Sequence, residues 1–107
     1  MDTVDACRRA GEIVVRAGFR LRHSSLKSEA RYYELAGRHG LLRIAAHQGR
    51  GDAIDGQPVV ARLTFVYASK REENRQSLSL TMDMLEAQTA GAIGRFMIAS
   101  FTTPTLD

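Results

Sequence analysis

The run from residue 59 to residue 68, Val-Val-Ala-Arg-Leu-Thr-Phe-Val-Tyr-Ala, most constrains what this chain can fold into. It is rich in β-branched and aromatic residues, which favour strands. A period of two separates Val59, Ala61, Leu63, Phe65 and Tyr67 from Val60, Arg62, Thr64 and Val66. Successive side chains of a strand point to opposite faces, so one face is wholly apolar and the other is mixed. This pattern predicts a central strand of a sheet, partly covered on both sides.

Three shorter strands are expected before it. Residues 19–23 alternate apolar and basic side chains, as a half-buried strand does. Residues 30–35 and 41–47 are separated by Gly37-Arg-His-Gly40, which favours a hairpin with a turn at 37–40. In the second strand of this hairpin, Leu42, Ile44 and Ala46 share one side, and Arg43, Ala45 and His47 share the other. Residues 48–58 contain three Gly, two Asp and one Pro, which predicts an exposed loop.

Helices are expected at both ends. Residues 3–17 form an amphipathic pattern that Asp2 or Thr3 can cap, and Gly18 stands where a left-handed C-cap belongs. Residues 78–84 fit two periods. A strand period joins Leu78, Leu80, Met82 and Met84, and a longer helical stripe joins Leu78, Met82, Leu85, Thr89, Ile93 and Phe96. We expect a helix from about residue 72 to about residue 100, because the helical pattern is the longer one.

Together these elements predict an α+β fold in a single domain, residues 1–107. It has an N-terminal helix, a three- to four-stranded antiparallel sheet and a long C-terminal helix packed on one face. The other face of the sheet is expected to be open and basic. A length of 107 residues leaves room for one modest core, and the 44% hydrophobic content suits a folded protein.

Several functional classes are excluded by composition. The single cysteine, Cys7, excludes an internal disulfide and a multi-cysteine zinc site, and favours a cytoplasmic protein. The sequence starts with acidic residues, so we expect no signal peptide. It contains no run of about 18 apolar residues, so we expect no membrane span. The chain contains no phosphate-binding loop and no dinucleotide fingerprint, so no cofactor is expected.

Basic residues are concentrated between Arg16 and Arg50. This segment holds eight basic residues and two acids, whereas the whole chain has a formal net charge of +3. Seven of the eight are arginines, which form bidentate hydrogen bonds with phosphate and stack on flat rings. Arginines interleaved with aromatic residues are typical of a surface that binds a polyanion.

This distribution predicts a small non-catalytic nucleic-acid-binding or regulatory protein. The partner is expected to be RNA or DNA, because nothing in the sequence separates the two. Arginines would contact phosphates, and one of the two adjacent tyrosines would stack on an unpaired base. The candidate residues are Arg20, Arg22, Arg31, Tyr32, Tyr33, Arg43, His47 and Arg62. Two alternatives stay open: an ordinary solvated face, and a face that docks on an acidic protein surface.

The three histidines give a further alternative. The spacing of His23, His39 and His47 matches no metal-ligand motif, so no metal site is expected. An imidazole near arginines can serve phosphodiester cleavage, which makes His47 a candidate general acid or base.

Two resemblances involve the same residues. Three segments resemble the core of HicA-type toxins. They are Ala17-Gly-Phe-Arg, Lys27-Ser-Glu-Ala-Arg-Tyr-Tyr33 and Leu42-Arg-Ile-Ala-Ala-His-Gln-Gly49. That resemblance implies an RNA-cleaving protein with a double-stranded-RNA-binding-domain-like fold of one helix, three strands and one helix. Here Glu29 replaces the family's catalytic His, which follows a Gly-Ser pair. Ala45 replaces the Pro of a later Pro-x-His, whose His corresponds to His47.

A second pattern of residues is similar to one in small phage and mobile-element proteins. It consists of Ser25, Ser28, Arg31 and Tyr32, followed by Arg43-Ile-Ala-Ala-His47. This resemblance implies a host protein complex as an alternative partner, bound by an inhibitor of the anti-CRISPR kind. A homodimer through Leu78, Met82, Leu85 and Ile93 of the expected C-terminal helix is a further possibility.

Overall fold

A computed structural model of the chain describes residues 2–25, 30–37, 40–69 and 73–102. The order of its elements confirms the α+β class. The helices are α1 (Thr3–Arg16), η1 (Met82–Met84) and α2 (Leu85–Thr102). The strands are β1 (Arg20–Ser25), β2 (Ala30–Ala36), β3 (Gly40–Gln48), β4 (Ala53–Ile54), β5 (Gln57–Ser69) and β6 (Glu73–Thr81).

The strands form one antiparallel sheet, in which β1, β2, β3, β5 and β6 lie side by side in this order. The short β4 pairs with the start of β5. The expected hairpin of residues 30–47 is confirmed as β2 and β3, and β5 is confirmed as a central strand. The sheet has six strands, not three or four. The loop expected at 48–58 contains a small hairpin, in which Asp55 and Gly56 have the positive φ angles (50° and 80°) of a tight turn.

The helix expected from residue 72 is wrong over its first part, because residues 73–81 form β6 and α2 begins at Leu85. As a strand, β6 pairs with β5 over most of its length and turns Leu78 and Leu80 toward the core. Met82, which the helical stripe would have buried, is 50% exposed. The reason is tertiary: pairing with the long apolar β5 satisfies the backbone of this segment and buries Leu80 completely.

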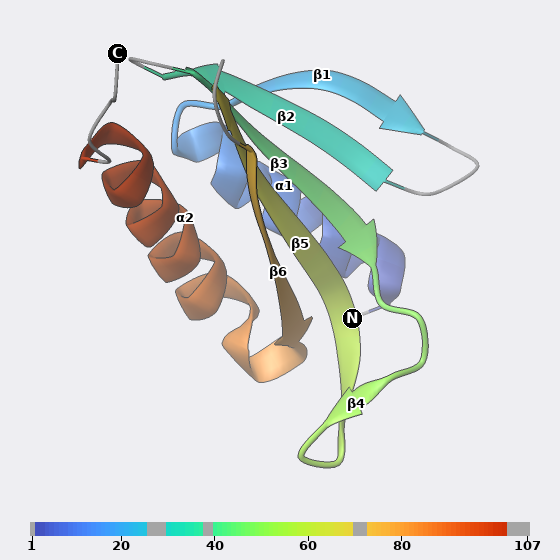
Figure 1. The fold of residues 1–107 in the computed structure, drawn as a ribbon. Helices are drawn as coiled ribbons and strands as arrows, with labels where there is room; N and C mark the ends of the chain where they lie inside the picture. The colour runs from blue at the N-terminus through green and yellow to red at the C-terminus, as the bar shows by residue number, and fades with distance from the viewer. Residues whose placement is uncertain (1, 26–29, 38–39, 70–72, 103–107) are drawn as a thin grey trace.

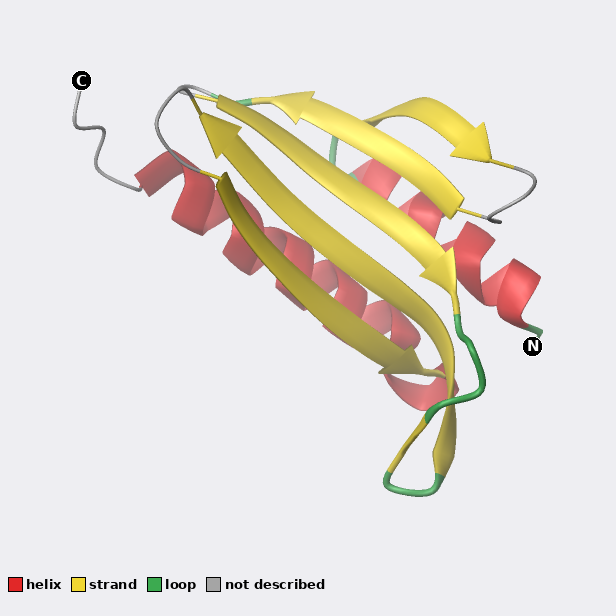
Figure 2. Cartoon of the chain, turned by 45° about the vertical axis from the view of Figure 1, so that its right-hand side comes forward, coloured by secondary structure: helices red, strands yellow, loops and turns green. Residues whose placement is uncertain are grey.

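Both helices cover the same face of the sheet (Figures 1 and 2). The Asp2 side chain caps α1 by accepting from the Asp5 amide at 2.8 Å, and Gly18 follows the helix with φ of 109°. The core lies between the helices and the sheet. Its largest fully buried side chains are Val14, Leu42, Ile44, Leu63, Leu80, Leu85 and Thr89.

The second face of the sheet carries no helix in the described part of the chain (Figure 2). The predicted open face is therefore present. On β5 the side chains of this face, Arg62, Thr64 and Val66, are half-buried, as expected for a strand partly covered on both sides. None of the described helices is long and apolar enough to cross a membrane. Of the four residues considered for a homodimer, Leu85 and Ile93 lie inside the chain's own core and Met82 is exposed. The homodimer stays a prediction.

Candidate functional site

Side chains on the open face are arranged in three rows that cross the strands. Residues directly opposite each other in an antiparallel pair project from the same face, so the register of the sheet defines each row. The arginine row consists of Arg20, Glu34, Arg43, Val66 and Arg75. The middle row consists of His23, Tyr32, Ala45, Thr64 and Ser77. The His47 row consists of His47, Arg62 and Ser79.

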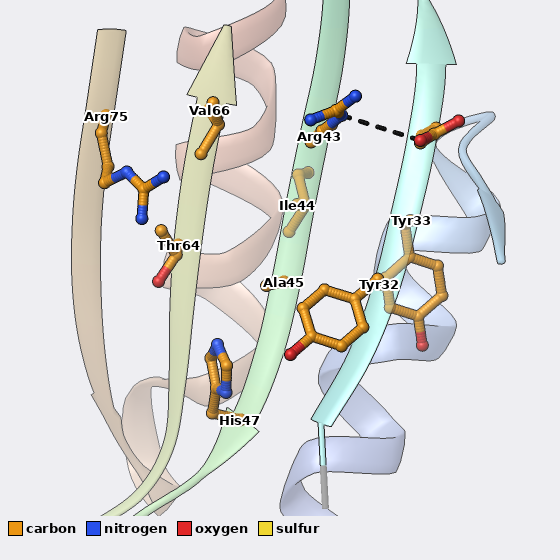
Figure 3. Close-up of a pocket in the computed structure, with 10 residues that line it drawn as sticks. Tyr32, Tyr33, Arg43, Ile44, Ala45, His47, Thr64, Val66 and Arg75 are labelled. Atoms are coloured by element: carbon orange, nitrogen blue, oxygen red, sulfur yellow. Dashed lines mark ion pairs between the residues drawn. The ribbon is translucent and has the colours of Figure 1, made fainter. Parts of the chain in front are cut away.

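Glu34 organises one end of the arginine row. Its carboxylate pairs with the Nε of Arg43 at 3.7 Å and with the Nε of Arg22 at 3.2 Å (Figure 3 marks the pair with Arg43). Arg22 reaches this face because it lies in a bulge, where the register of β1 against β2 shifts between Leu21 and His23. Both arginine side chains are more than half exposed, so these pairs contribute little to stability.

Aromatic rings meet at one end of the middle row. Tyr32 is 37% exposed, and its ring stacks on His23 with the centroids 5.8 Å apart. The ring of His47 meets Tyr32 edge to face at 6.2 Å. In Figure 3 the Tyr32 ring extends over β3 toward His47. The exposed part of the Tyr32 ring and the polar ring edges of the two histidines are suited to contact with another flat ring.

Beyond Tyr32, the small side chains of the middle row leave a hollow of about 350 Å³ in the sheet face. Ala45 and Thr64 lie at its centre, and arginines stand at its rim (Figure 3). Its lining residues are Tyr32, Tyr33, Glu34, Arg43, Ile44, Ala45, His47, Thr64, Val66 and Arg75.

The His47 row places an imidazole opposite a guanidinium. Burial, and then the charges of Arg62 and Arg50, lower the pKa of His47 below its usual value. The imidazole is therefore neutral at neutral pH. The Nε of Arg62 is buried, and no described group accepts a hydrogen bond from it. An anion bound here would supply the missing acceptor and favour the protonated form of His47.

Two residues predicted for this face lie on the other side of the sheet. Tyr33 is 3% exposed, and its hydroxyl rests against Gly11 of α1. Arg31 lies beside the Tyr33 hydroxyl, and burial raises the pKa of Tyr33. Tyr32 and Tyr33 are adjacent in one strand, so only one of them can face each side. The structure places Tyr32 on the open face and makes Tyr33 a core residue.

The remaining predicted residues, Arg20, Arg22, Arg43, His47 and Arg62, are brought together on the open face. Arg75, Ser77 and Ser79 also lie on this face, and the helix expected from residue 72 left them out of the predicted site. The alternation of these residues with Leu78 and Leu80 is the signal that would have found them.

Within the described residues, no three His, Cys, Asp or Glu side chains are grouped to hold a metal ion. His39 and Glu29 lie outside the described residues, as does part of the expected turn at 37–40. Comparisons of the chain with protein-family models, with curated proteins and with solved structures find no match. The resemblances to HicA-type toxins and to phage proteins stay predictions.

Proposed function

We propose that this protein binds nucleic acid through the open face of its sheet. The observation that carries the proposal is the exposed Tyr32 ring at the edge of a hollow, with Arg43 and Arg75 in the lining of the hollow and Arg62 in the His47 row beside it. Arginines supply phosphate contacts that do not depend on base identity, and an exposed ring supplies a stacking surface for a base.

Charge supports the same conclusion. Of the side chains that the structure describes on this face, five are arginines and one is a glutamate. On the helix side, by contrast, Arg8 pairs with Asp5 and Arg9 pairs with Glu86. Among the described side chains, arginines thus outnumber acids on the open face, whereas Arg8 and Arg9 of α1 each have an acidic partner. A local excess of one sign attracts a polyanion and speeds its association.

The test is fluorescence polarisation of labelled RNA and DNA at about 50 mM and about 200 mM salt. Several phosphate contacts give a steep loss of affinity between these two concentrations. The double variant Arg43→Ala with Arg62→Ala should weaken binding and flatten the salt dependence. The matched control is Arg16→Ala with Arg95→Ala, which removes the same charge from exposed positions on the two helices. Equal effects of the two double variants would refute binding at the open face.

Absence of binding to any nucleic acid at low salt would refute the proposal. It would favour the alternative partner, an acidic surface of a host protein complex. A pull-down with the wild-type chain and the Arg43→Ala, Arg62→Ala variant as bait would then test that partner.

A second candidate function is cleavage of RNA, favoured by the neutral imidazole of His47 directly opposite Arg62. His47 would take the proton of a ribose 2′-hydroxyl, and the 2′-oxygen would attack the adjacent phosphorus. Arg62 would stabilise the negative charge on the phosphoryl oxygens. The 5′-oxygen would leave and receive a proton from water, which gives a cyclic phosphate and a 5′-hydroxyl.

Incubation with RNA and with DNA of the same sequence tests this activity. Cleavage of RNA alone, lost in His47→Ala, would support it, because DNA lacks the 2′-hydroxyl. Intact RNA with the wild-type chain would leave nucleic-acid binding as a non-catalytic function.

A further inference from the structure

We infer that the open face takes nucleic acid as a single strand that lies along the middle row, across the β-strands, with one unpaired base on Tyr32. This inference rests on the function proposed above and specifies which form of nucleic acid the face accepts and how it is oriented.

The arginine row and the His47 row form the two sides of a trough, and the middle row forms its floor. Residues two apart in a strand are separated by about 6.8 Å, so the arginine row and the His47 row are about 13–14 Å apart. Neighbouring strands are about 4.8 Å apart, which makes the middle row about 14 Å long from β2 to β6. Its floor consists of Ala45, Thr64 and Ser77, whose side chains are small.

The position of the charges sets the direction of the ligand. Arg43 and Arg75 stand on one side of the trough, and Arg62 stands on the other. A strand that follows the middle row passes Arg43 and then Arg75 on one side and Arg62 on the other. A strand that ran parallel to β3 would meet Arg43 at one end of the hollow and His47 with Arg62 at the other, and would bypass Arg75 on β6.

The aromatic end selects an unpaired base. In a duplex, each base face is covered by its neighbours, and a side chain cannot stack on it without unstacking the helix. Tyr32 is supported from behind by His23 and presents its ring at the edge of the hollow. An unpaired base can lie on such a ring at no unstacking cost. Threonine and serine hydroxyls along the floor then accept or donate hydrogen bonds to the sugar or base edges.

The experiment compares labelled single strands of about 12 nucleotides with hairpin duplexes of the same composition, as RNA and as DNA, by fluorescence polarisation. We expect single strands to bind at least about tenfold more tightly than duplexes. Tyr32→Leu should lower single-strand affinity about tenfold, whereas Tyr32→Phe keeps the ring and should retain it. The RNA and DNA arms show which sugar the floor prefers.

A second pair of variants tests the path without changing Tyr32. Ser77→Glu puts an acid in the far end of the trough, and Gln76→Glu adds the same charge to the opposite side of the same strand. Both positions are exposed, so both variants should fold. We expect Ser77→Glu to weaken single-strand binding severalfold more than Gln76→Glu.

The outcomes separate the inference from the proposed function. Duplex binding as tight as single-strand binding would overturn the inference and leave nucleic-acid binding in place. Equal effects of Ser77→Glu and Gln76→Glu would overturn the path along the middle row. No binding of any strand would overturn both the inference and the proposed function.

Discussion

The hydroxyl of Tyr33 in β2 occupies the space that a side chain at Gly11 of α1 would need. Through this contact α1 packs on the sheet at the point where Tyr32 and Tyr33 project from opposite faces. With Tyr33 held against α1, Tyr32 projects from the opposite face, beside His23 and His47. The packing of the core and the composition of the open face are therefore linked through two adjacent residues.

Gly11→Ala should destabilise the protein. Its Cβ would collide with the hydroxyl end of Tyr33, a buried side chain that would have to shift, at a cost of about 1–3 kcal/mol in the free energy of unfolding. The control is Gly94→Ala in α2, where no atom outside the helix lies near the new carbon. There the higher helix propensity of alanine should stabilise by about 0.5–1 kcal/mol. Urea denaturation measures both, and stabilisation by Gly11→Ala would contradict the close contact.

Leu80→Ala and Met82→Ala distinguish β6 from the helix that the sequence favoured. Leu80 is fully buried, so its truncation should cost about 2–5 kcal/mol in unfolding free energy. Met82 is 50% exposed, and its truncation should change stability by no more than about 0.5 kcal/mol. A helix across residues 78–96 would give the larger loss at Met82, and thermal or urea unfolding of the two variants decides between them.

Glu34→Gln should strengthen binding of nucleic acid. The carboxylate neutralises part of the charge of Arg22 and Arg43, and its removal frees both guanidiniums for phosphate. We expect affinity to rise severalfold at low salt, with a salt dependence steeper by about one phosphate contact. Glu12→Gln is the control, because it makes the same change on α1. Polarisation titrations that show the same gain for both variants would indicate a general effect of net charge.

His47 should make stability depend on pH in the acidic range. Its pKa in the folded chain is below the usual value of about 6.5, so the unfolded chain binds the proton more readily as the pH falls through that value. Folding is consequently weakened as the pH falls below about 6.5, and the loss stops once the pH is below the pKa of the folded chain. His47→Gln should lose less unfolding free energy between pH of about 7.5 and about 5 than the wild type. Identical pH profiles from urea denaturation would contradict the lowered pKa.

Local sequence specified much of the fold. The hairpin of β2 and β3, the long central β5 and the first helix follow from periodicity and from turn and capping residues, which act over a few positions. The same alternation assigned Arg43, Ala45 and His47 to one face before any strand was paired. Six of the eight candidate residues, Tyr32 among them, lie together on the open face.

Long-range packing determined the rest. Residues 78–84 satisfy both a helical and a strand period. Pairing with residues 59–63 of β5 made residues 78–81 part of a strand, and Met82–Met84 form η1. That pairing brought Arg75, Ser77 and Ser79 to the site. The choice between Tyr32 and Tyr33 likewise depended on where α1 packs. Periodicity places neighbouring side chains on opposite faces, but which face is covered depends on elements distant in the chain, because burial is a property of the assembled layers.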